Sequence, residues 1–248
     1  MSLERFTVVE LADGDAVGAR AAELFLAIGA EAQRARGTFT VALAGGSTPA
    51  AMHKALREAP SHEFNWGSVD VFFGDERAVA PDSPLSNFGN ARAQLLDQVP
   101  LARVHPMPAW SDDLDAGATA YERALRDACG DDGALDLLVM GVGEDAHILS
   151  LFPGCPLIDE DGGALVAALH DPPMNPAVSR ITLTPTALRR AHNVLVLLVG
   201  AKKREARRAL SSASVTASSA PVLLLDTRLA LTRGREATVL LLDHASRP

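Results

Sequence analysis

The sequence is poor in cysteine and contains no long apolar run. Two cysteines among 248 residues are too few for a disulfide framework or a cysteine zinc site, and they suit a reducing compartment. The apolar runs are far shorter than the roughly 18 residues of a membrane-spanning helix, and the first residues lack a secretion-signal pattern. A formal net charge of −8 leaves no basic footprint for nucleic acid. We therefore expect a cytoplasmic protein that binds neither nucleic acid nor membranes.

The composition is that of an ordinary folded protein. Hydrophobic residues make up 48% of the chain and charged residues 22%, both within the usual range. The length allows one large α/β domain or two small ones. No repeat, low-complexity tract or linker divides the sequence, so we expect a single domain over residues 1–248. An acidic protein can still hold a small anion through a few local cations and backbone amides.

Strand patterns alternate with amphipathic helix patterns along the whole chain. The expected strands are residues 5–11, 38–44, 69–73, 135–140, 164–169, 180–184, 194–199 and 237–242. The expected helices cover 15–34, 49–59, 87–99, 112–129, 185–191 and 202–210. This alternation predicts a mostly parallel sheet with helices on both faces. Ligands bind such sheets beyond the carboxyl ends of the strands, where several of these strands lead into polar loops.

A Gly-Gly-Ser-Thr-Pro segment follows the second expected strand. Glycines at a helix start expose backbone amides, and with the hydroxyls of Ser47 and Thr48 they can form an anion cradle. The alternative is a helix that is simply capped by Ser47 or Thr48, with Pro49 at its first position. Capping needs only one hydroxyl, so the paired glycines and hydroxyls favour phosphate binding. No Gly-Lys-Ser/Thr follows, which excludes the nucleotide P-loop.

Charged residues occupy three other element boundaries. Asp75, Glu76 and Arg77 follow the third expected strand and are either solvated loop residues or include an arginine that holds an anionic substrate bidentately. Arg180 begins a strand, and Lys203 follows the glycine that closes another. Because a cation in the first turn of a helix opposes the helix dipole, Lys203 is a candidate for ligand binding.

The strand expected at 135–140 leads into the richest group of acid and base residues. It ends in glycines, and Glu144, Asp145 and His147 follow. A lone histidine is more often structural than catalytic. A histidine beside carboxylates, however, can be held in one tautomer and can move a proton near neutral pH.

The same loop fits the G-x-G-x-x-A pattern of dinucleotide-binding proteins. Pro153 would cut short the helix that should follow. The later acids at 159–161 lie in a glycine-bearing loop instead of at a strand end. A dinucleotide-dependent dehydrogenase is therefore disfavoured.

Five motifs occur in a fixed order between about residues 40 and 205. They are Ala44–Pro49, Gly74–Arg77 with Ser86-Asn87, Gly141–His147 with Ser150–Gly154, Arg180–Thr184, and Gly200–Lys203. Together they resemble the 6-phosphogluconolactonase family. The resemblance implies a three-layer α/β/α fold with a Rossmann-like sheet. It also implies hydrolysis of 6-phosphoglucono-δ-lactone in the oxidative pentose phosphate pathway, without a cofactor or metal.

The resemblance also implies roles for single residues. The phosphate-binding residues would be Gly45, Gly46, Ser47, Thr48, Arg180 and Lys203, and the reacting end would be lined by Asp75, Arg77, Asp145 and His147. His147 would be the general base, with Asp145 or Glu144 steadying the imidazolium. Arg77 or the loop amides near residues 141–143 would stabilise the oxyanion. The expected partner is a phosphorylated sugar lactone, and the expected state is a monomer or a weak homo-oligomer.

One departure and two rival functions accompany this resemblance. Ala146 stands where the family usually has glycine, so a positive φ at this position would strain the backbone. A glucosamine-6-phosphate deaminase or isomerase would share the phosphate loop, but those enzymes look like Asp-Glu-Tyr where this chain has Asp75, Glu76 and Arg77. A non-catalytic sugar-phosphate sensor would need the phosphate-binding groups without the base.

Overall fold

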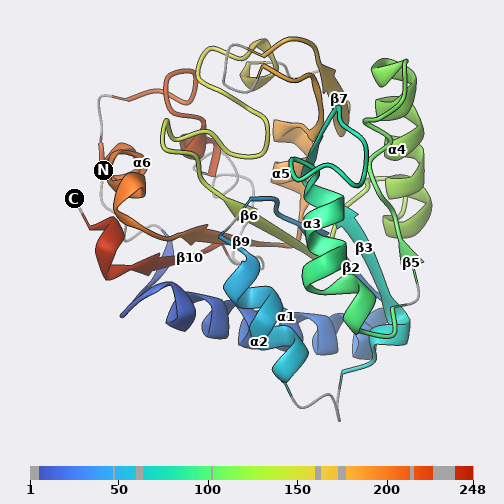
Figure 1. Ribbon diagram of the computed structural model, residues 1–248, viewed down its shortest axis with the longest axis horizontal. Helices are drawn as coiled ribbons and strands as arrows, with labels where there is room; N and C mark the ends of the chain where they lie inside the picture. Colours follow the sequence, from blue (N-terminus) through green and yellow to red (C-terminus); the bar gives the residue numbers. More distant parts are fainter. Residues whose placement is uncertain are drawn as a thin grey trace.

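A seven-stranded parallel sheet forms the centre of the protein (Figure 1). The structure, a computed structural model, describes residues 6–46, 48–59, 64–101, 103–159, 163–172, 177–212, 215–225 and 238–247. Within them the strands lie in the order β1 (Thr7–Leu11), β10 (Thr238–Asp243), β9 (Asn193–Leu198), β6 (Leu137–Gly141), β2 (Phe39–Leu43), β3 (Val69–Phe73) and β5 (Arg103–Val104). The central strands are buried on both faces, as their mostly apolar sequences predict.

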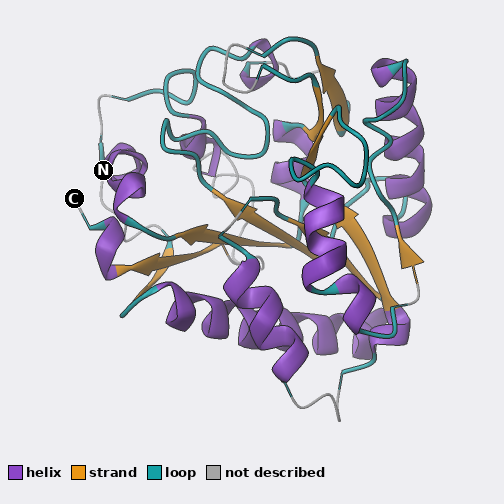
Figure 2. Cartoon of the chain, in the orientation of Figure 1, coloured by secondary structure: helices purple, strands orange, loops and turns teal. Residues whose placement is uncertain are grey.

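Helices cover both faces of this sheet (Figure 2). Their bounds are α1 Gly14–Arg36, α2 Ala50–Glu58, α3 Asn87–Gln94, α4 Leu114–Cys129, α5 Pro185–Arg190 and α6 Arg204–Ser211. On one face Phe39 packs against Phe25 of α1, with ring centroids 5.2 Å apart. On the other, Phe72 packs against Tyr121 of α4 at 5.7 Å. The predicted α/β fold is confirmed. None of the described helices is both long and apolar enough to cross a membrane.

Helix ends follow the local signals in most places. Asp13 caps α1 by accepting from the Ala16 amide at 2.9 Å, and α1 ends at Gly37 with a φ of +79°. The predicted start of α2 is wrong in detail, because Pro49 is the N-cap residue and no side chain caps the helix. Thr48 instead lines the cavity described below, and Ser47 lies outside the described residues.

A second, antiparallel sheet was not predicted. It consists of β4 (Asp75–Arg77), β8 (Arg180–Leu183) and β7 (Val166–Leu169). The tripeptide of β4 was expected to be a loop, yet it pairs with β8 so that Arg77 lies opposite Arg180. Gly74 joins the two sheets, since its amide bonds to Leu43 of β2 and its carbonyl accepts from Leu183 of β8. The small sheet therefore begins where β3 of the main sheet ends.

Asp70 of β3 is an ion-pair centre at the amino end of its strand. Its carboxylate, 3% exposed, accepts from Arg103 Nε and Nη2 at 2.5 and 2.6 Å and from His105 Nε2 at 2.9 Å. Burial alone would raise the pKa of Asp70, but the hydrogen bonds from Arg103 and His105 outweigh it, so the pKa lies below the usual value. Asp70 is thus ionised in the folded protein at neutral pH.

Asp70→Asn is expected to lower the free energy of unfolding at pH 7 by about 2 kcal/mol, the usual contribution of hydrogen bonds to a charged group. Because folding depresses the pKa of Asp70, its stabilisation is full above the unfolded pKa near ~4 and is lost as pH falls through the folded value. Urea unfolding should therefore show a difference from wild type that shrinks as the pH falls below about 4. Asp127→Asn, on the exposed side of α4, is the control. A deficit that does not change with pH would refute the assignment.

Candidate active site

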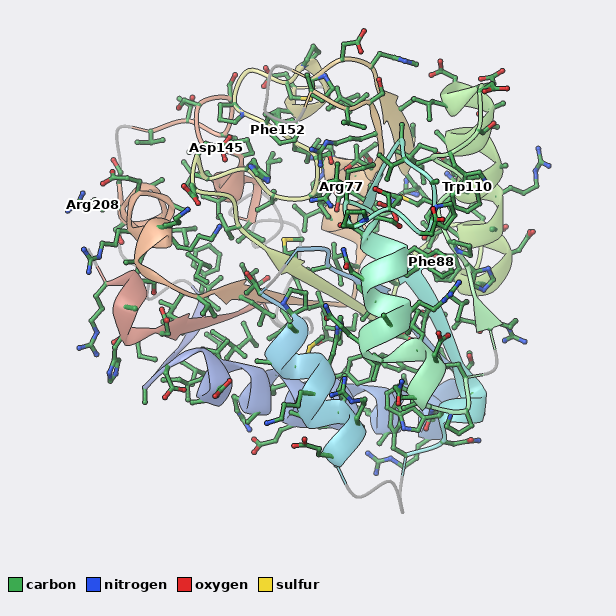
Figure 3. All side chains as sticks on the ribbon, in the orientation of Figure 1. Arg77, Phe88, Trp110, Asp145, Phe152 and Arg208 are labelled. Carbon is green, nitrogen blue, oxygen red and sulfur yellow. The ribbon has the colours of Figure 1, made fainter. Side chains whose placement is uncertain are left out.

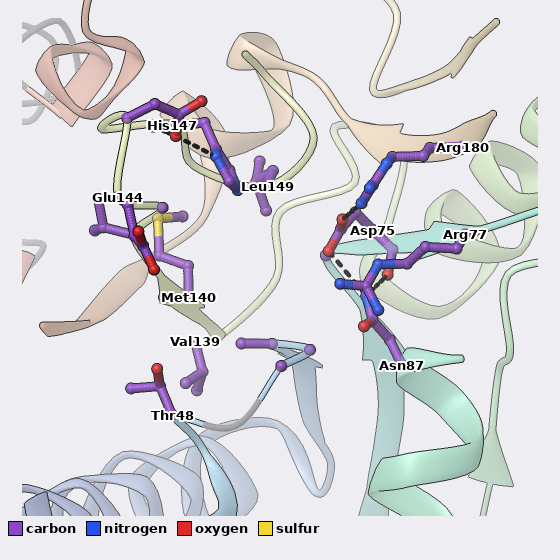
Figure 4. Close-up of a pocket in the computed structure, with 18 of the residues that line it drawn as sticks. Thr48, Asp75, Arg77, Asn87, Val139, Met140, Glu144, His147, Leu149 and Arg180 are labelled. Carbon is purple, nitrogen blue, oxygen red and sulfur yellow. Dashed lines mark hydrogen bonds and ion pairs between the residues drawn. The ribbon is translucent and has the colours of Figure 1, made fainter. Parts of the chain in front are cut away.

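A cavity of about 580 Å³ lies beyond the carboxyl ends of β2, β3 and β6 (Figure 4). Nine predicted site residues line it, namely Gly45, Gly46, Thr48, Asp75, Arg77, Asp145, His147, Arg180 and Lys203. The tenth, Ser47, lies outside the described residues. Figure 3 shows Arg77, Asp145 and Phe152 on the same side of the main sheet. Residues that are far apart in sequence therefore meet at one edge of the sheet.

His147 is held by Asp145. The distance from His147 Nδ1 to Asp145 Oδ1 is 2.6 Å. Burial raises the pKa of Asp145, but the hydrogen bond and charge of His147 outweigh it, so the pKa is lowered and the carboxylate stays ionised. An ionised carboxylate only accepts, so Nδ1 carries a proton, and in the neutral form of the ring Nε2 keeps a free electron pair. This is the arrangement that a general base needs.

Glu144, the other carboxylate considered for this role, points elsewhere. Its Oε1 lies 3.2 Å from the Nζ of Lys202, and both side chains are largely exposed. Lys202 in turn belongs to the turn that precedes α6. The structure therefore selects Asp145, and not Glu144, as the partner of His147.

The loop that carries His147 has an unusual backbone. Ala146 has a φ of +67° and Leu149 a φ of +55°, in the left-handed region where a side chain costs about 1 kcal/mol. Backbone bonds offset this cost: Gly143 donates to His147 O at 2.8 Å, and Ala146 O accepts from Val222 at 2.9 Å. The positive φ considered for Ala146 is present, with the strain it brings.

Asp75 is bonded to protein groups on several sides. Ser150 Oγ donates to its Oδ2 at 2.6 Å, and Asn87 Nδ2 donates to its Oδ1 at 3.1 Å. Arg180 Nη1 lies 3.7 Å from Oδ2. Asp75 thereby connects β4 with α3, β8 and the His147 loop. Asn87 and Ser150 were not predicted as site residues, although both stand in the motifs that carry the family resemblance.

Glu76 supports this arrangement from the other side of β4. Its buried carboxylate accepts from Ser86 Oγ at 2.9 Å and from the amides of Asn87 and Phe88 at 2.8 and 2.7 Å. Burial raises the pKa of Glu76, partly opposed by these bonds. Glu76 thus caps the start of α3, together with the N-cap residue Ser86, and fixes Asn87 beside Asp75.

The cations lie on two walls of the cavity. Arg77 donates from Nη1 to Leu85 O and lies near Arg180. The Arg180 side chain is 4% exposed, and its Cζ lies 5.2 Å from the centroid of the Phe152 ring. Burial lowers the pKa of the Lys203 ammonium, while Glu144 and Asp145 oppose this shift. In Figure 4, Thr48 lies across the cavity from Arg180. The predicted phosphate-binding residues that the structure describes therefore line the cavity from more than one side.

Metal ligands do not gather here. Among the described residues, no group of three or more His, Cys, Asp or Glu side chains is placed to hold a metal ion. The chemistry available to the cavity from the chain itself is that of an oriented imidazole, several cations and the backbone amides of glycine-rich loops.

A histidine paired with a carboxylate, together with three cations on the walls of the cavity, suits an anionic substrate. A family model described as glucosamine-6-phosphate isomerases/6-phosphogluconolactonase matches residues 12–232, and the chain belongs to this family. The 6-phosphogluconolactonase of Streptomyces coelicolor is 35% identical over 229 residues, covering 87% of this chain and 84% of the relative.

Further comparisons agree. The 6-phosphogluconolactonase of a Nostoc species is 36% identical over 206 residues, covering 81% of this chain and 82% of the relative. The solved 6-phosphogluconolactonase of Trypanosoma cruzi matches with a TM-score of 0.83 and 25% identity, covering 99% of this chain and 97% of the other. The resemblance to 6-phosphogluconolactonases that the motifs predicted is confirmed.

Proposed function

We propose that this protein hydrolyses 6-phospho-D-glucono-1,5-lactone to 6-phosphogluconate, the hydrolytic step of the oxidative pentose phosphate pathway. The observation that carries the proposal is the His147–Asp145 pair, 2.6 Å apart, in a cavity that also holds Arg77, Arg180 and Lys203. The two relatives compared above, both named 6-phosphogluconolactonase, support the proposal. A cytoplasmic location belongs to the proposal, since a chain with only two cysteines among 248 residues suits a reducing compartment.

His147 activates water in this mechanism. Its Nε2 takes a proton from a water molecule as the water oxygen attacks the lactone carbonyl carbon, while Asp145 stabilises the imidazolium. Arg77 or the loop amides of residues 141–143 stabilise the negative charge on the carbonyl oxygen. The bond to the ring oxygen then breaks, and the imidazolium returns its proton to the departing alkoxide. The products are a carboxylic acid, ionised at neutral pH, and a free hydroxyl group.

The phosphate supplies binding energy away from the reacting carbon. Gly45, Gly46 and Thr48 line the cavity at the end of β2, and Lys203 and Arg180 contribute charge from its walls. Backbone amides and fixed cations are the usual partners of phosphate groups. Burial lowers the pKa of Lys203. A bound anion would raise this pKa again, because it stabilises the charged ammonium.

An assay of the lactone tests the proposal directly. Glucose-6-phosphate dehydrogenase generates the lactone in situ, and its decay is followed with and without the protein. Decay faster than the spontaneous rate is expected, and no acceleration would contradict the function. Ammonia release from glucosamine 6-phosphate would instead identify a deaminase, and binding of 6-phosphogluconate without turnover of the lactone would identify a sensor.

Lys203→Gln is expected to raise the KM for the lactone at least about 10-fold, with a smaller change in kcat. A lost charged hydrogen bond to phosphate is worth about 1.5–3 kcal/mol, and a contact made equally in ground and transition states affects mainly KM. Lys202→Gln is the matched control, because that side chain is 80% exposed and pairs with Glu144. Equal effects of the two substitutions on KM would argue against a phosphate contact at Lys203.

A further inference from the structure

The loop that carries His147 depends on contacts at its far end. Ala146 and Leu149 both have positive φ values, +67° and +55°, so the loop conformation is not one that the free chain prefers. Three residues after His147 the chain reaches Ser150, which is completely buried. Whatever fixes Ser150 therefore also fixes the path of the loop.

Ser150 is bonded to both strands of the small sheet that carry site residues. Its Oγ donates to Asp75 Oδ2 of β4 at 2.6 Å, and its amide donates to Thr182 Oγ1 of β8 at 3.1 Å. The preceding Leu149 packs close to Gly74, where an added methyl group would lie 2.8 Å from Leu149 Cδ2. The His147 loop of the main sheet is thus docked onto the sheet that carries Arg77 and Arg180.

Ser150 does this without facing the substrate. The residues that line the cavity include Leu149, His147 and Asp75, while Ser150 lies behind them. A short hydroxyl-to-carboxylate bond is stronger than one between neutral groups. Without the bond from Ser150, the remaining charged neighbour of Asp75 Oδ2 would be Arg180 Nη1, which now lies 3.7 Å away. We expect the carboxylate then to move toward that guanidinium and away from the loop.

We propose that Ser150 is a positioning residue: its hydrogen bond to Asp75 sets the distance between the base His147 and the side chain of Arg77. This inference rests on the proposed lactone hydrolysis and adds a residue to it. A base displaced by about 1 Å from its working position can lose about 100-fold in rate. Ser150 therefore affects turnover more than substrate binding.

Ser150→Ala is expected to lower kcat for the lactone at least about 10-fold, with KM changed less than about 3-fold. Ser246→Ala is the matched control, because Ser246 is equally buried and its Oγ bonds to Asp243 O, outside the cavity lining. The control should lose stability in thermal melts but keep its kcat. Retention of kcat by Ser150→Ala, or a change confined to KM, would overturn the proposal.

A double-mutant cycle with Asp75→Ala, which removes the acceptor, separates positioning through Asp75 from a general packing effect. If Ser150 acts through Asp75, adding Ser150→Ala to Asp75→Ala should lower kcat by less than about 2-fold further. Effects that multiply would contradict the proposed route. If Ser150→Ala does not fold, Ser150→Cys tests the same bond with similar volume and a weak donor, and a normal kcat in that variant would overturn the proposal. Absence of lactone hydrolysis in the wild type would instead refute the proposed function.

Discussion

His147→Ala is expected to lower kcat for the lactone by at least about 100-fold, the low end for loss of a general base. The ring is the only imidazole that lines the cavity within the described residues. Its Nδ1 is engaged by Asp145 at 2.6 Å, which leaves Nε2 for the water. KM should change little, since the imidazole contributes mainly to the transition state.

The control for this substitution is another histidine paired with a carboxylate. His170 Nε2 lies 3.1 Å from Asp115 Oδ2, and both side chains are exposed. His170→Ala removes a histidine from a carboxylate pair that does not line the cavity and should leave the rate of lactone decay unchanged. A near-normal rate in His147→Ala would remove His147 from the mechanism, even if the wild type hydrolyses the lactone.

Gly143→Ala is expected to reduce kcat about as strongly, by about 100-fold, although it removes no functional group. A methyl group at Gly143 would lie 2.1 Å from His147 Nδ1 and 2.6 Å from Asp145 Oδ1. Both members of the pair would have to move, and the ring would leave the position from which it reaches the water. Residue 143 is outside the left-handed region, so the loss would come from this collision and not from backbone strain.

Gly141→Ala provides the comparison within the same loop. There the nearest atom to an added methyl is Thr48 Oγ1 at 4.0 Å, an ordinary contact distance. Lactone hydrolysis by this variant should fall far less than hydrolysis by Gly143→Ala, while circular dichroism shows both to be folded. Equal losses would mean that the loop tolerates no side chain at all, and the steric explanation would fail.

The main sheet could be predicted from sequence because its signals are local. The run at residues 194–199 is apolar throughout and is followed at once by Gly200. The carboxyl ends of parallel strands meet at one edge. The placement of Asp75, Asp145 and Lys203 at one edge of the sheet therefore followed from their positions just after expected strands, and their site roles followed from the family resemblance.

The small sheet could not be predicted in the same way. Asp75, Glu76 and Arg77 have no apolar alternation, and their burial depends on distant donors that become neighbours after folding. Ser150 lies 75 positions from Asp75 in sequence, and Asn87 reads as a helix residue. A long-range contact between polar groups leaves no periodic pattern in the sequence, so the network around Asp75 had to be observed.

The pairing of the edge strand β1 with β10 has a consequence for how the chain folds. Thr7 of β1 pairs with Val239 of β10, and β10 is the strand that connects β1 to β9. During synthesis β1 emerges before the other strands of the main sheet, and it cannot pair with β10 until the strands between them have been made. Such distant pairings slow folding, because the entropy of closing the loop is lost before the contact forms. The strands that carry the cavity can therefore assemble earlier, and the completion of this edge is the late step of folding.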